Sequence, residues 1–282
     1  MKDNKKHKKA EYGILITGLI ILLAVACIIA LCAGQYSVSV PEVTKILASR
    51  FVNVTKTWSN TAEGVVFTLR LPRIIGAVLV GSALSLSGAA YQGVFKNPLV
   101  APDLLGVSSG ACVGASVAIL LHLNSFGVQA MAFVAGILAV GLTLFIPRLI
   151  KNTNMTMLVL SGIIVKGIMD SVMGIIKYVA DPETELQSIT YWQLGSLTKV
   201  LPKDLFTVGP VIVAASVIIF LLRWRINILS LGDREAKTLG VSVTVVRNFI
   251  IICATLLTAS AVCISGTIGW IGLVIPHFAR ML

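Results

Sequence analysis

Charged side chains are scarce in this sequence. They account for 12% of its 282 residues, whereas soluble proteins typically carry about 25%. Hydrophobic residues account for 56%, and the mean hydropathy is +0.93. The sequence has no low-complexity tract and no stretch that resembles a soluble domain. This composition excludes an ordinary soluble protein and indicates an integral membrane protein.

Motifs for catalysis are also lacking. The sequence contains neither a G-x-x-x-x-G-K-[ST] phosphate-binding loop nor an H-E-x-x-H zinc motif. Its three histidines, His7, His122 and His277, lie far apart, so they do not indicate a shared metal site. The sequence therefore predicts that the chain is not an enzyme and binds no metal or cofactor itself.

Cysteines are few, and their number is odd. All five lie in apolar runs without the paired spacing of metal ligands, at Cys27, Cys32, Cys112, Cys253 and Cys263. Free thiols buried among apolar side chains are the expected state of such residues.

Long apolar runs dominate the chain. A run of 18 or more mostly apolar residues can cross a hydrocarbon core of roughly 30 Å. The sequence predicts an all-α polytopic membrane protein with about eight such helices, the last of them short. Their ranges are Gly13–Gly34, Ile74–Val94, Leu104–Leu123, Phe126–Ile146, Met157–Val179, Leu205–Leu222, Phe249–Gly266 and Trp270–Leu282. The first run is longer than the 7–15 residues of a signal-peptide core, so we expect it to be a retained helix.

Positive charge is unevenly distributed along the chain. The net charge is +11, and alternating spans would place most cationic residues on one side of the membrane. Cationic residues gather on cytoplasmic loops, so the pattern predicts a multi-pass cell-membrane protein with a cytoplasmic N-terminus and not a nucleic-acid-binding protein. Residues 1–12 form the cytoplasmic basic tail, and residues 38–64 and 180–202 lie outside, the second with a short helix. The cations that set this orientation are Lys2, Lys5, Lys6, Lys8, Lys9, Arg148, Lys151, Arg223, Arg225 and Arg280.

One polar segment interrupts the apolar runs. Residues 231–241 read LGDREAKTLGV, with Asp233, Arg234, Glu235 and Lys237 within five positions. A short charged helix between membrane spans is suited to docking a soluble partner.

Two ionisable residues lie within the fifth apolar run. Lys166 and Asp170 are four residues apart, so they share a helix face and can form an ion pair. Ionisable residues inside a membrane are costly and suggest function. They could form an ion-coupling or substrate-contact site, or simply neutralise each other. The sequence has no clear internal repeat, which weakens the case for an ion-driven transporter built from inverted repeats.

Two further polar features leave alternatives open. Arg70 and Arg73 lie near the outer end of the second span, where they could extend to lipid headgroups or bind carboxylates of an external partner. Asn97-Pro98 interrupts the helix after that span. It fits the mouth of a pore or an ordinary turn.

Small residues recur at helical spacing in two of the spans. Such residues allow helix backbones to approach closely in lipid, so they predict a tightly packed bundle. They are Ala77, Gly81, Ser85 and Ala89 in one span, and Gly106, Gly110, Gly114 and Ala118 in the next.

Several clustered motifs together resemble the permease subunits of ABC importers for iron–siderophores, haem and cobalamin. They run in family order over essentially the whole chain. The motifs are RLPR at 70–73, GAAYQ at 88–92, NPLVAPD at 97–103, LGVSSGA at 105–111, LGDREA at 231–236 with LG at 239–240, and GWIGLVIPH at 269–277.

The resemblance implies partners and residue roles. It implies a single permease domain, 1–282, that pairs with a second and usually identical permease subunit. Two separate subunits bind ATP and Mg, and an extracytoplasmic binding protein delivers the substrate. Arg70 and Arg73 would dock the binding protein, Asn97 and Leu99 would line the cytoplasmic end of the path, and Met155 and Thr156 would form part of the gate. Coupling to the ATP-binding subunit would fall in residues 228–243, through Leu231, Gly232, Asp233, Arg234, Glu235, Ala236, Leu239 and Gly240.

The chain departs from the family pattern in two ways. Family members normally have about ten spans, so we expect that C-terminal helices are missing here. Lys166 and Asp170 stand where small or neutral residues are expected. The resemblance implies ATP-driven import by alternating access, with a ferric siderophore as the first substrate candidate and haem or cobalamin as others. An ion-coupled transporter using Lys166 and Asp170 is the alternative.

Overall fold

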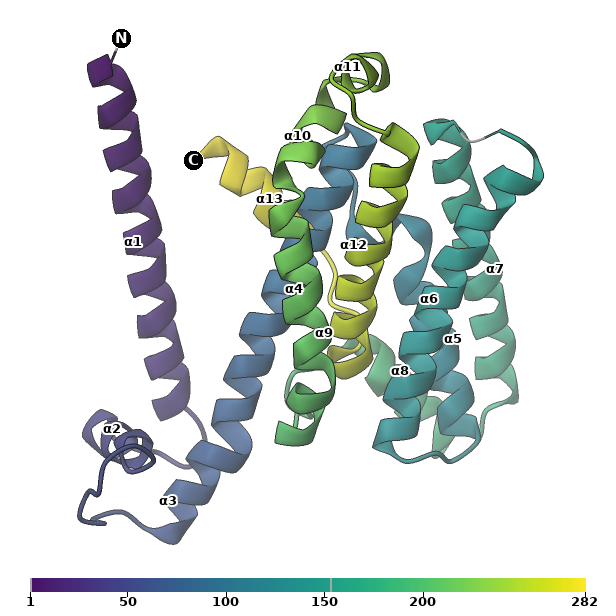
Figure 1. The fold of residues 1–282 in the computed structure, drawn as a ribbon. Coiled ribbons are helices and arrows are strands. Elements are labelled where there is room, and N and C mark those ends of the chain that lie inside the picture. The colour runs from purple at the N-terminus through teal and green to yellow at the C-terminus, as the bar shows by residue number, and fades with distance from the viewer. Residues whose placement is uncertain (1, 153) are drawn as a thin grey trace. The chain divides into compact units, whose positions relative to one another are not determined.

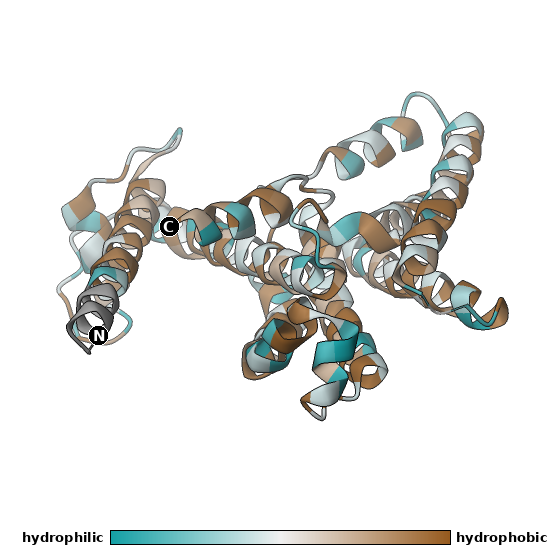
Figure 2. Cartoon of the chain, turned by 90° about the horizontal axis from the view of Figure 1, so that it is seen from above, coloured by the Kyte–Doolittle hydropathy of each residue, from teal (hydrophilic) through white to brown (hydrophobic). Residues whose placement is uncertain are grey.

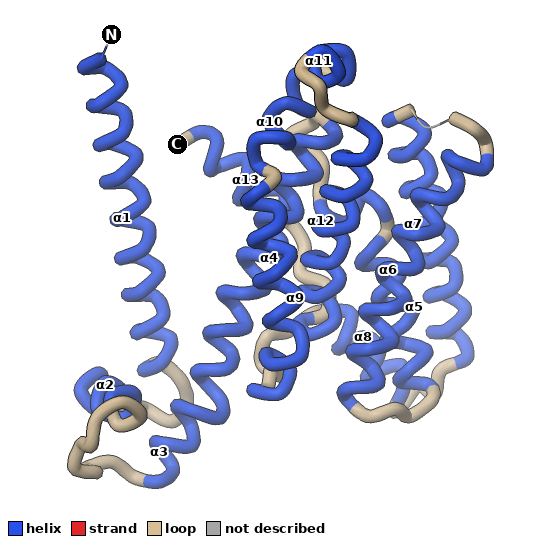
Figure 3. Tube along the Cα trace, in the orientation of Figure 1, coloured by secondary structure: helices blue, strands red, loops and turns tan. Residues whose placement is uncertain are grey.

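The computed structural model describes residues 2–152 and 154–282, with side chains from residue 11 onward. The described residues form helices joined by loops, with no strand among them (Figure 3). This confirms the all-α prediction. The chain divides into two compact units, residues 1–75 and residues 76–282, where the sequence predicts one domain.

The first unit contains one long helix and three short helical segments. Its elements are α1 (Lys2–Cys32), α2 (Val40–Ala48), α3 (Asn60–Gly64) and the π-helix η1 (Val65–Arg70). Residues 2–12, expected as a basic tail, are part of α1. The apolar stretch of α1, Glu11–Cys32, is long enough to cross a membrane. The turn between α1 and α2 packs on η1 through a small core that includes Leu31, Val43, Ile46 and Val66.

The second unit is a helical bundle. Its long helices are α4 (Leu71–Phe95, which begins in the first unit), α6 (Ser125–Leu149), α7 (Met155–Val179), α9 (Pro202–Leu221) and α12 (Val243–Ser265). Its shorter elements are the 3₁₀ helix η2 (Pro102–Leu105), α5 (Val107–Leu120), α8 (Glu185–Leu194), α10 (Arg223–Leu231), α11 (Asp233–Thr238) and α13 (Ile271–Met281). Figure 1 shows α11 at the end of this bundle opposite to α8. The short outer helix predicted between residues 180 and 202 is therefore present as α8.

Local sequence signals begin several of these helices. The Asn124 side chain accepts a hydrogen bond from the Gly127 amide at 2.9 Å and caps α6. Pro202 occupies the first turn of α9, where its missing N–H is not needed. The Asp204 carboxylate then accepts a hydrogen bond from the Leu201 amide at 2.9 Å.

The apolar helices have two lengths. Among the described residues, six helices are long and apolar enough to cross a membrane, and two shorter apolar ones, α5 and α13, accompany them. These eight correspond to the eight predicted runs. The predicted span Leu104–Leu123 is corrected, because Gly106 has a φ of +80° and ends η2 before α5 begins. Hydrophobic residues occur all along the long helices (Figure 2), and many, such as Ile163 and Val213, are exposed on the surface. That surface suits a lipid environment.

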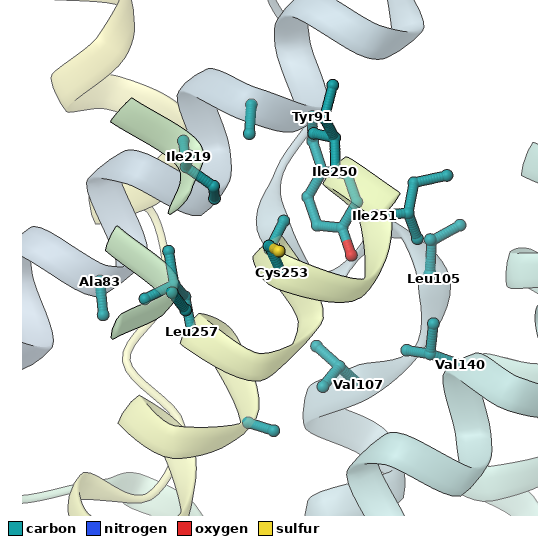
Figure 4. Packing of buried hydrophobic residues seen from close by; sticks show 14 of the residues in the cluster. Ala83, Tyr91, Leu105, Val107, Val140, Ile219, Ile250, Ile251, Cys253 and Leu257 are labelled. Carbon is teal, nitrogen blue, oxygen red and sulfur yellow. The ribbon is translucent and has the colours of Figure 1, made fainter. Parts of the chain in front are cut away.

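α12 is the central helix of the second unit. Of the residues in its most apolar stretch 78% are buried, compared with 33% in α6 and 28% in α7. Figure 4 shows Ile250 and Ile251 of this helix near Tyr91 from α4 and Leu105 from η2, and Leu257 beside Ala83 of α4. The Tyr91 hydroxyl lies 3.0 Å from that of Thr255, which satisfies both groups inside the bundle.

Small residues bring some helices into close contact. A Cβ atom at Gly110 would lie 2.8 Å from the Ala135 carbonyl oxygen, so α5 and α6 pack through this position and through Gly114. Gly106 is not part of that helix face, contrary to the prediction. On α4 the predicted stripe is only partly buried, and Ala77 is exposed. The close contact is instead between Gly88 of α4 and the Gly272 backbone of α13.

Candidate functional site

α11 contains the charged segment that the sequence predicts as a docking site. Its buried residue is Ala236, while Arg234, Glu235 and Lys237 are exposed. Leu231 and Leu239, which flank the helix, are also exposed, at 65% and 60%. Gly240 has a φ of +76° that favours glycine, and it ends the turn into α12. The segment therefore presents charged and apolar side chains together at one end of the bundle.

The Asp233 carboxylate fastens α11 to two other helices. Arg247 Nη2 of α12 donates hydrogen bonds to both carboxylate oxygens at 2.8 Å. Lys96 is the residue directly after α4, and its Nζ lies 3.1 Å from Asp233 Oδ1. The hydrogen bond from Arg247 is the largest cause that lowers the pKa of Asp233 below its ordinary value. Asp233 thus links α11 to the end of α4 and to α12.

The chain between α4 and η2 has no regular structure, and it is exposed up to Leu99 and buried at Val100. Asn97 Oδ1 accepts a hydrogen bond from the Leu99 amide at 2.9 Å, which forms a tight turn. η2 follows, and Asp103 Oδ1 accepts a hydrogen bond from the Ser108 amide at 2.9 Å in the first turn of α5. Non-helical backbone inside a membrane is tolerated where protein or a cavity surrounds it. The predicted break at Asn97-Pro98 is therefore present, as a turn between α4 and η2.

Gln92 holds this irregular segment against α13. Its Nε2 donates hydrogen bonds to the Val100 carbonyl at 3.3 Å and to the Leu273 carbonyl at 3.2 Å. Its Oε1 accepts a hydrogen bond from Arg280. One buried amide thus joins α4, the segment before η2, and α13.

Lys166 and Asp170 do not form the ion pair that their spacing predicts. Lys166 Nζ lies 2.9 Å from Asp103 Oδ2, so its partner comes from a segment 63 residues earlier. The close approach of α7 to η2 explains this choice. A Cβ atom at Gly106 would lie 3.5 Å from the Lys166 amide nitrogen, and Asp103 is therefore within reach of the lysine. Asp170, one turn further along α7, lines a cavity.

That cavity lies inside the second unit and has a volume of about 420 Å³. It is bounded by the two non-helical stretches, those before α5 and before α13. Its polar lining comes from Asp103, Ser108, Ser109, Asp170, Gln193, Thr258 and Thr267. Gly106–Gly110 fits the G-x-S-x-G pattern of hydrolases, but no histidine of the described residues lines the cavity beside Ser108. The lining can bind a polar group, and its charged side chains are the carboxylates of Asp103 and Asp170.

The residues expected along the path and at the gate lie in two different places. Asn97 lines a cavity of about 510 Å³ with α9 and α10. Met155 lines another of about 310 Å³ with α11 and α12. Leu99 is 75% exposed and Thr156 is also exposed. The structure thus places Met155 next to the coupling segment and does not bring it into one cavity with Asn97.

Arg70 and Arg73 differ in their surroundings. Arg70 is 8% exposed, and its guanidinium donates hydrogen bonds to the carbonyls of Leu31, Cys32 and Tyr36. The carbonyls at the end of α1 have no partner in the helix, and Arg70 satisfies them. Arg70 thus makes three hydrogen bonds within the first unit, and its docking of a binding protein stays a prediction. Arg73 is half-buried, and its Nε has no partner among the described residues.

Sequence reasoning missed the residues that connect these elements. Lys96, Asp103 and Arg247 were given no specific role, although each binds a residue of the predicted sites. Lys96 directly precedes the NPLVAPD motif, and Asp103 is its last residue. A charged residue next to a helix break was therefore a signal that the sequence offered. Arg247 carried no signal beyond its charge.

Comparisons with known proteins agree with this arrangement. The model of the FecCD transport family matches residues 22–282. The molybdate import system permease protein MolB of Haemophilus influenzae is 37% identical over 273 residues, which cover 96% of this chain and 80% of MolB. The probable iron chelatin transport system permease protein of Helicobacter pylori is 42% identical over 217 residues, which cover 77% of this chain and 65% of that protein.

A further relative and a solved structure extend the comparison. The hemin transport system permease protein HmuU of Yersinia pestis is 37% identical over 221 residues, 76% of this chain and 65% of HmuU. A solved structure assigned to a metal-chelate type ABC transporter in an inward-facing conformation superimposes with a TM-score of 0.84. It is 35% identical in sequence, and the match covers 96% of this chain and 82% of that one.

Proposed function

The chain belongs to the FecCD transport family, and on that premise we propose that it is the permease subunit of an ATP-driven importer. Two ATP-binding subunits drive it from the cytoplasm, a second permease subunit completes the path, and an extracytoplasmic binding protein supplies the substrate. The ATP and Mg belong to the partner subunits. The relatives named above are permease proteins of import or transport systems, which supports this role.

The attachment of α11 is the observation that best supports the proposal. A docking helix can pass the motion of its partner subunit to the transmembrane helices only if it is held rigidly to them. Asp233 ties α11 to α4 through Lys96 and to α12 through Arg247. The exposed Leu231, Glu235 and Leu239 remain available for an ATP-binding subunit. The positive-inside pattern supports placing this end, and with it the N-terminus, in the cytoplasm.

The substrate we propose is a metal-containing compound, with a ferric siderophore or another iron chelate first. The relatives are named for molybdate, iron chelatin and hemin, each of which contains a transition metal. The two cavities with the largest volumes differ in charge, because Asp103 and Asp170 line one, and Lys96, Arg223 and Arg280 line the other. We expect the binding protein to make the selection among these compounds.

Uptake by the reconstituted complex tests the proposal. Vesicles containing the permease, its ATP-binding subunits and its binding protein are offered labelled ferric siderophore, haemin, cobalamin and molybdate. We expect uptake of one of them that needs internal ATP and persists after an ionophore collapses the membrane potential. Uptake that continues after ATP depletion and stops when the ionophore collapses the membrane potential would instead support ion coupling through Lys166 and Asp170.

A variant of the docking helix tests the role of α11. Leu239→Glu places a carboxylate on the exposed face, so we expect ATP hydrolysis to persist while uptake falls. Leu221→Glu is a matched control, because Leu221 is also exposed, at 73%, but lies at the end of α9 and not beside α11. Equal uptake by the wild type and Leu239→Glu would show that this face of α11 does not couple ATP hydrolysis to uptake.

A further inference from the structure

A second polar cavity lies beside α11 and is not explained by docking. It has a volume of about 310 Å³ and lies between α6, α7, α11 and α12. Three cationic side chains line it, Arg148 of α6, Lys237 of α11 and Arg247 of α12. Asp233 is the single carboxylate among the described residues of the lining. The cavity therefore has an excess of positive charge.

The N-termini of two long helices add to that positive charge. Asn154 and Met155 bring the first turn of α7 into the lining, and Val243 and Thr244 bring the first turn of α12. These helices have 25 and 23 residues, and neither N-cap side chain forms a capping hydrogen bond. The first amides of a helix carry partial positive charge and bind anions readily. Both helix ends and the three cationic side chains therefore favour an anion in this cavity.

Arg247 retains donors for such a ligand. Its side chain is 12% exposed, and Nη2 makes both hydrogen bonds to Asp233. Within residues 2–152 and 154–282, no hydrogen bond of Nη1 is found. A largely buried arginine with a fixed plane is well suited to a planar or tetrahedral oxyanion. Asp233 thus orients the guanidinium and does not use all of its donors.

We propose that this cavity binds a phosphate group. Its volume of about 310 Å³ accommodates one phosphate with some water, since a water molecule occupies about 30 Å³ in the liquid. The phosphate is either free inorganic phosphate or the headgroup of an anionic phospholipid, because basic pockets between membrane helices bind such headgroups. The bound group connects α11 with α6 and α7, which Asp233 does not reach. This site goes beyond the transport function proposed above, although it includes Asp233 and Lys237 of α11.

Binding of inorganic phosphate to the purified permease tests the site. The full chain is delipidated in neutral detergent and titrated with phosphate in a calorimeter, in wild-type form and as Arg148→Gln. We expect Arg148→Gln to weaken the affinity about tenfold or more, the effect of losing one hydrogen bond to a charged group. Lys151→Gln is the matched control, because it removes the same charge from the same turn but does not line the cavity.

A second arm identifies the lipid source. The same variants are placed in nanodiscs of phosphatidylcholine with or without phosphatidylglycerol, and the thermal unfolding midpoint is measured. Stabilisation by phosphatidylglycerol that Arg148→Gln removes and Arg148→Lys restores assigns the site to the headgroup. The proposal fails if neither phosphate nor phosphatidylglycerol binds, or if Lys151→Gln weakens binding as much as Arg148→Gln. These readouts do not depend on transport, so they stand apart from the importer proposal.

Discussion

Arg247 and Asp233 form a two-oxygen ion pair at the junction of α12 and α11, with Nη2 at 2.8 Å from both carboxylate oxygens. Lys96, the residue directly after α4, binds the same carboxylate, so that Asp233 also connects α11 with the end of α4. The pair lies next to exposed charged and apolar residues of α11. Its geometry makes the position of α11 dependent on one side chain.

Asp233→Asn should loosen α11 without unfolding the bundle. The pair is partly exposed, with Asp233 at 47%, so we expect a loss of about 1 kcal/mol or less in the free energy of unfolding. The larger effect should be on coupling, with more ATP hydrolysed per substrate imported by the reconstituted complex. Asp181→Asn, an exposed carboxyl next to α8, is the control. An unchanged ratio of hydrolysis to uptake would show that α11 needs no such anchor.

The pH dependence of this anchor follows from the lowered pKa of Asp233. The hydrogen bond from Arg247 holds that pKa below the ordinary value of 3.8. A depressed pKa in the folded state gives stability that is present above 3.8 and is lost as the pH falls through the lower folded-state pKa. The difference in thermal midpoint between wild type and Asp233→Asn should therefore stay constant from neutral pH down to this range and shrink below it. A difference that disappears already near neutral pH would contradict the assignment.

Close packing of α4 against α13 predicts a steric effect. A methyl group at Gly88 would collide with the backbone of Gly272, whereas one at Gly81 on the same helix meets no atom within 4 Å. We expect Gly88→Ala to destabilise the bundle by about 1–3 kcal/mol, the usual cost of overpacking. Thermal unfolding in detergent measures the effect. Gly81→Ala should leave the midpoint unchanged or raise it, because alanine favours helix.

The sequence predicts helices far better than it predicts which side chains meet. Apolar runs identify the eight apolar helices because the membrane requires both length and hydrophobicity. The break near Asn97 is readable because proline interrupts a helix. The sequence places Gly106 inside a span, whereas its positive φ ends η2 before α5 begins. A sequence does not distinguish a glycine that adopts a positive φ from a glycine that packs against a neighbouring helix.

Contacts between distant segments depend on tertiary packing. The spacing of Lys166 and Asp170 predicts a local pair, and it is wrong because η2 brings Asp103 closer to the lysine. Arg70 looks like a surface cation in sequence. Its role inside the first unit depends on where the chain turns after α1, which no local pattern specifies.

The partner of Lys166 can be measured with double-mutant cycles. Lys166→Gln combined with Asp103→Asn should show a coupling energy of about 0.5 kcal/mol or more, the range for residues in contact. Lys166→Gln combined with Asp170→Asn should be additive to within about 0.5 kcal/mol, as for residues that do not interact. Unfolding in detergent supplies the free energies. Strong coupling to Asp170 and none to Asp103 would overturn the contact and restore the local ion pair. Additivity with Asp170 would exclude the interpretation in which Lys166 and Asp170 simply neutralise each other.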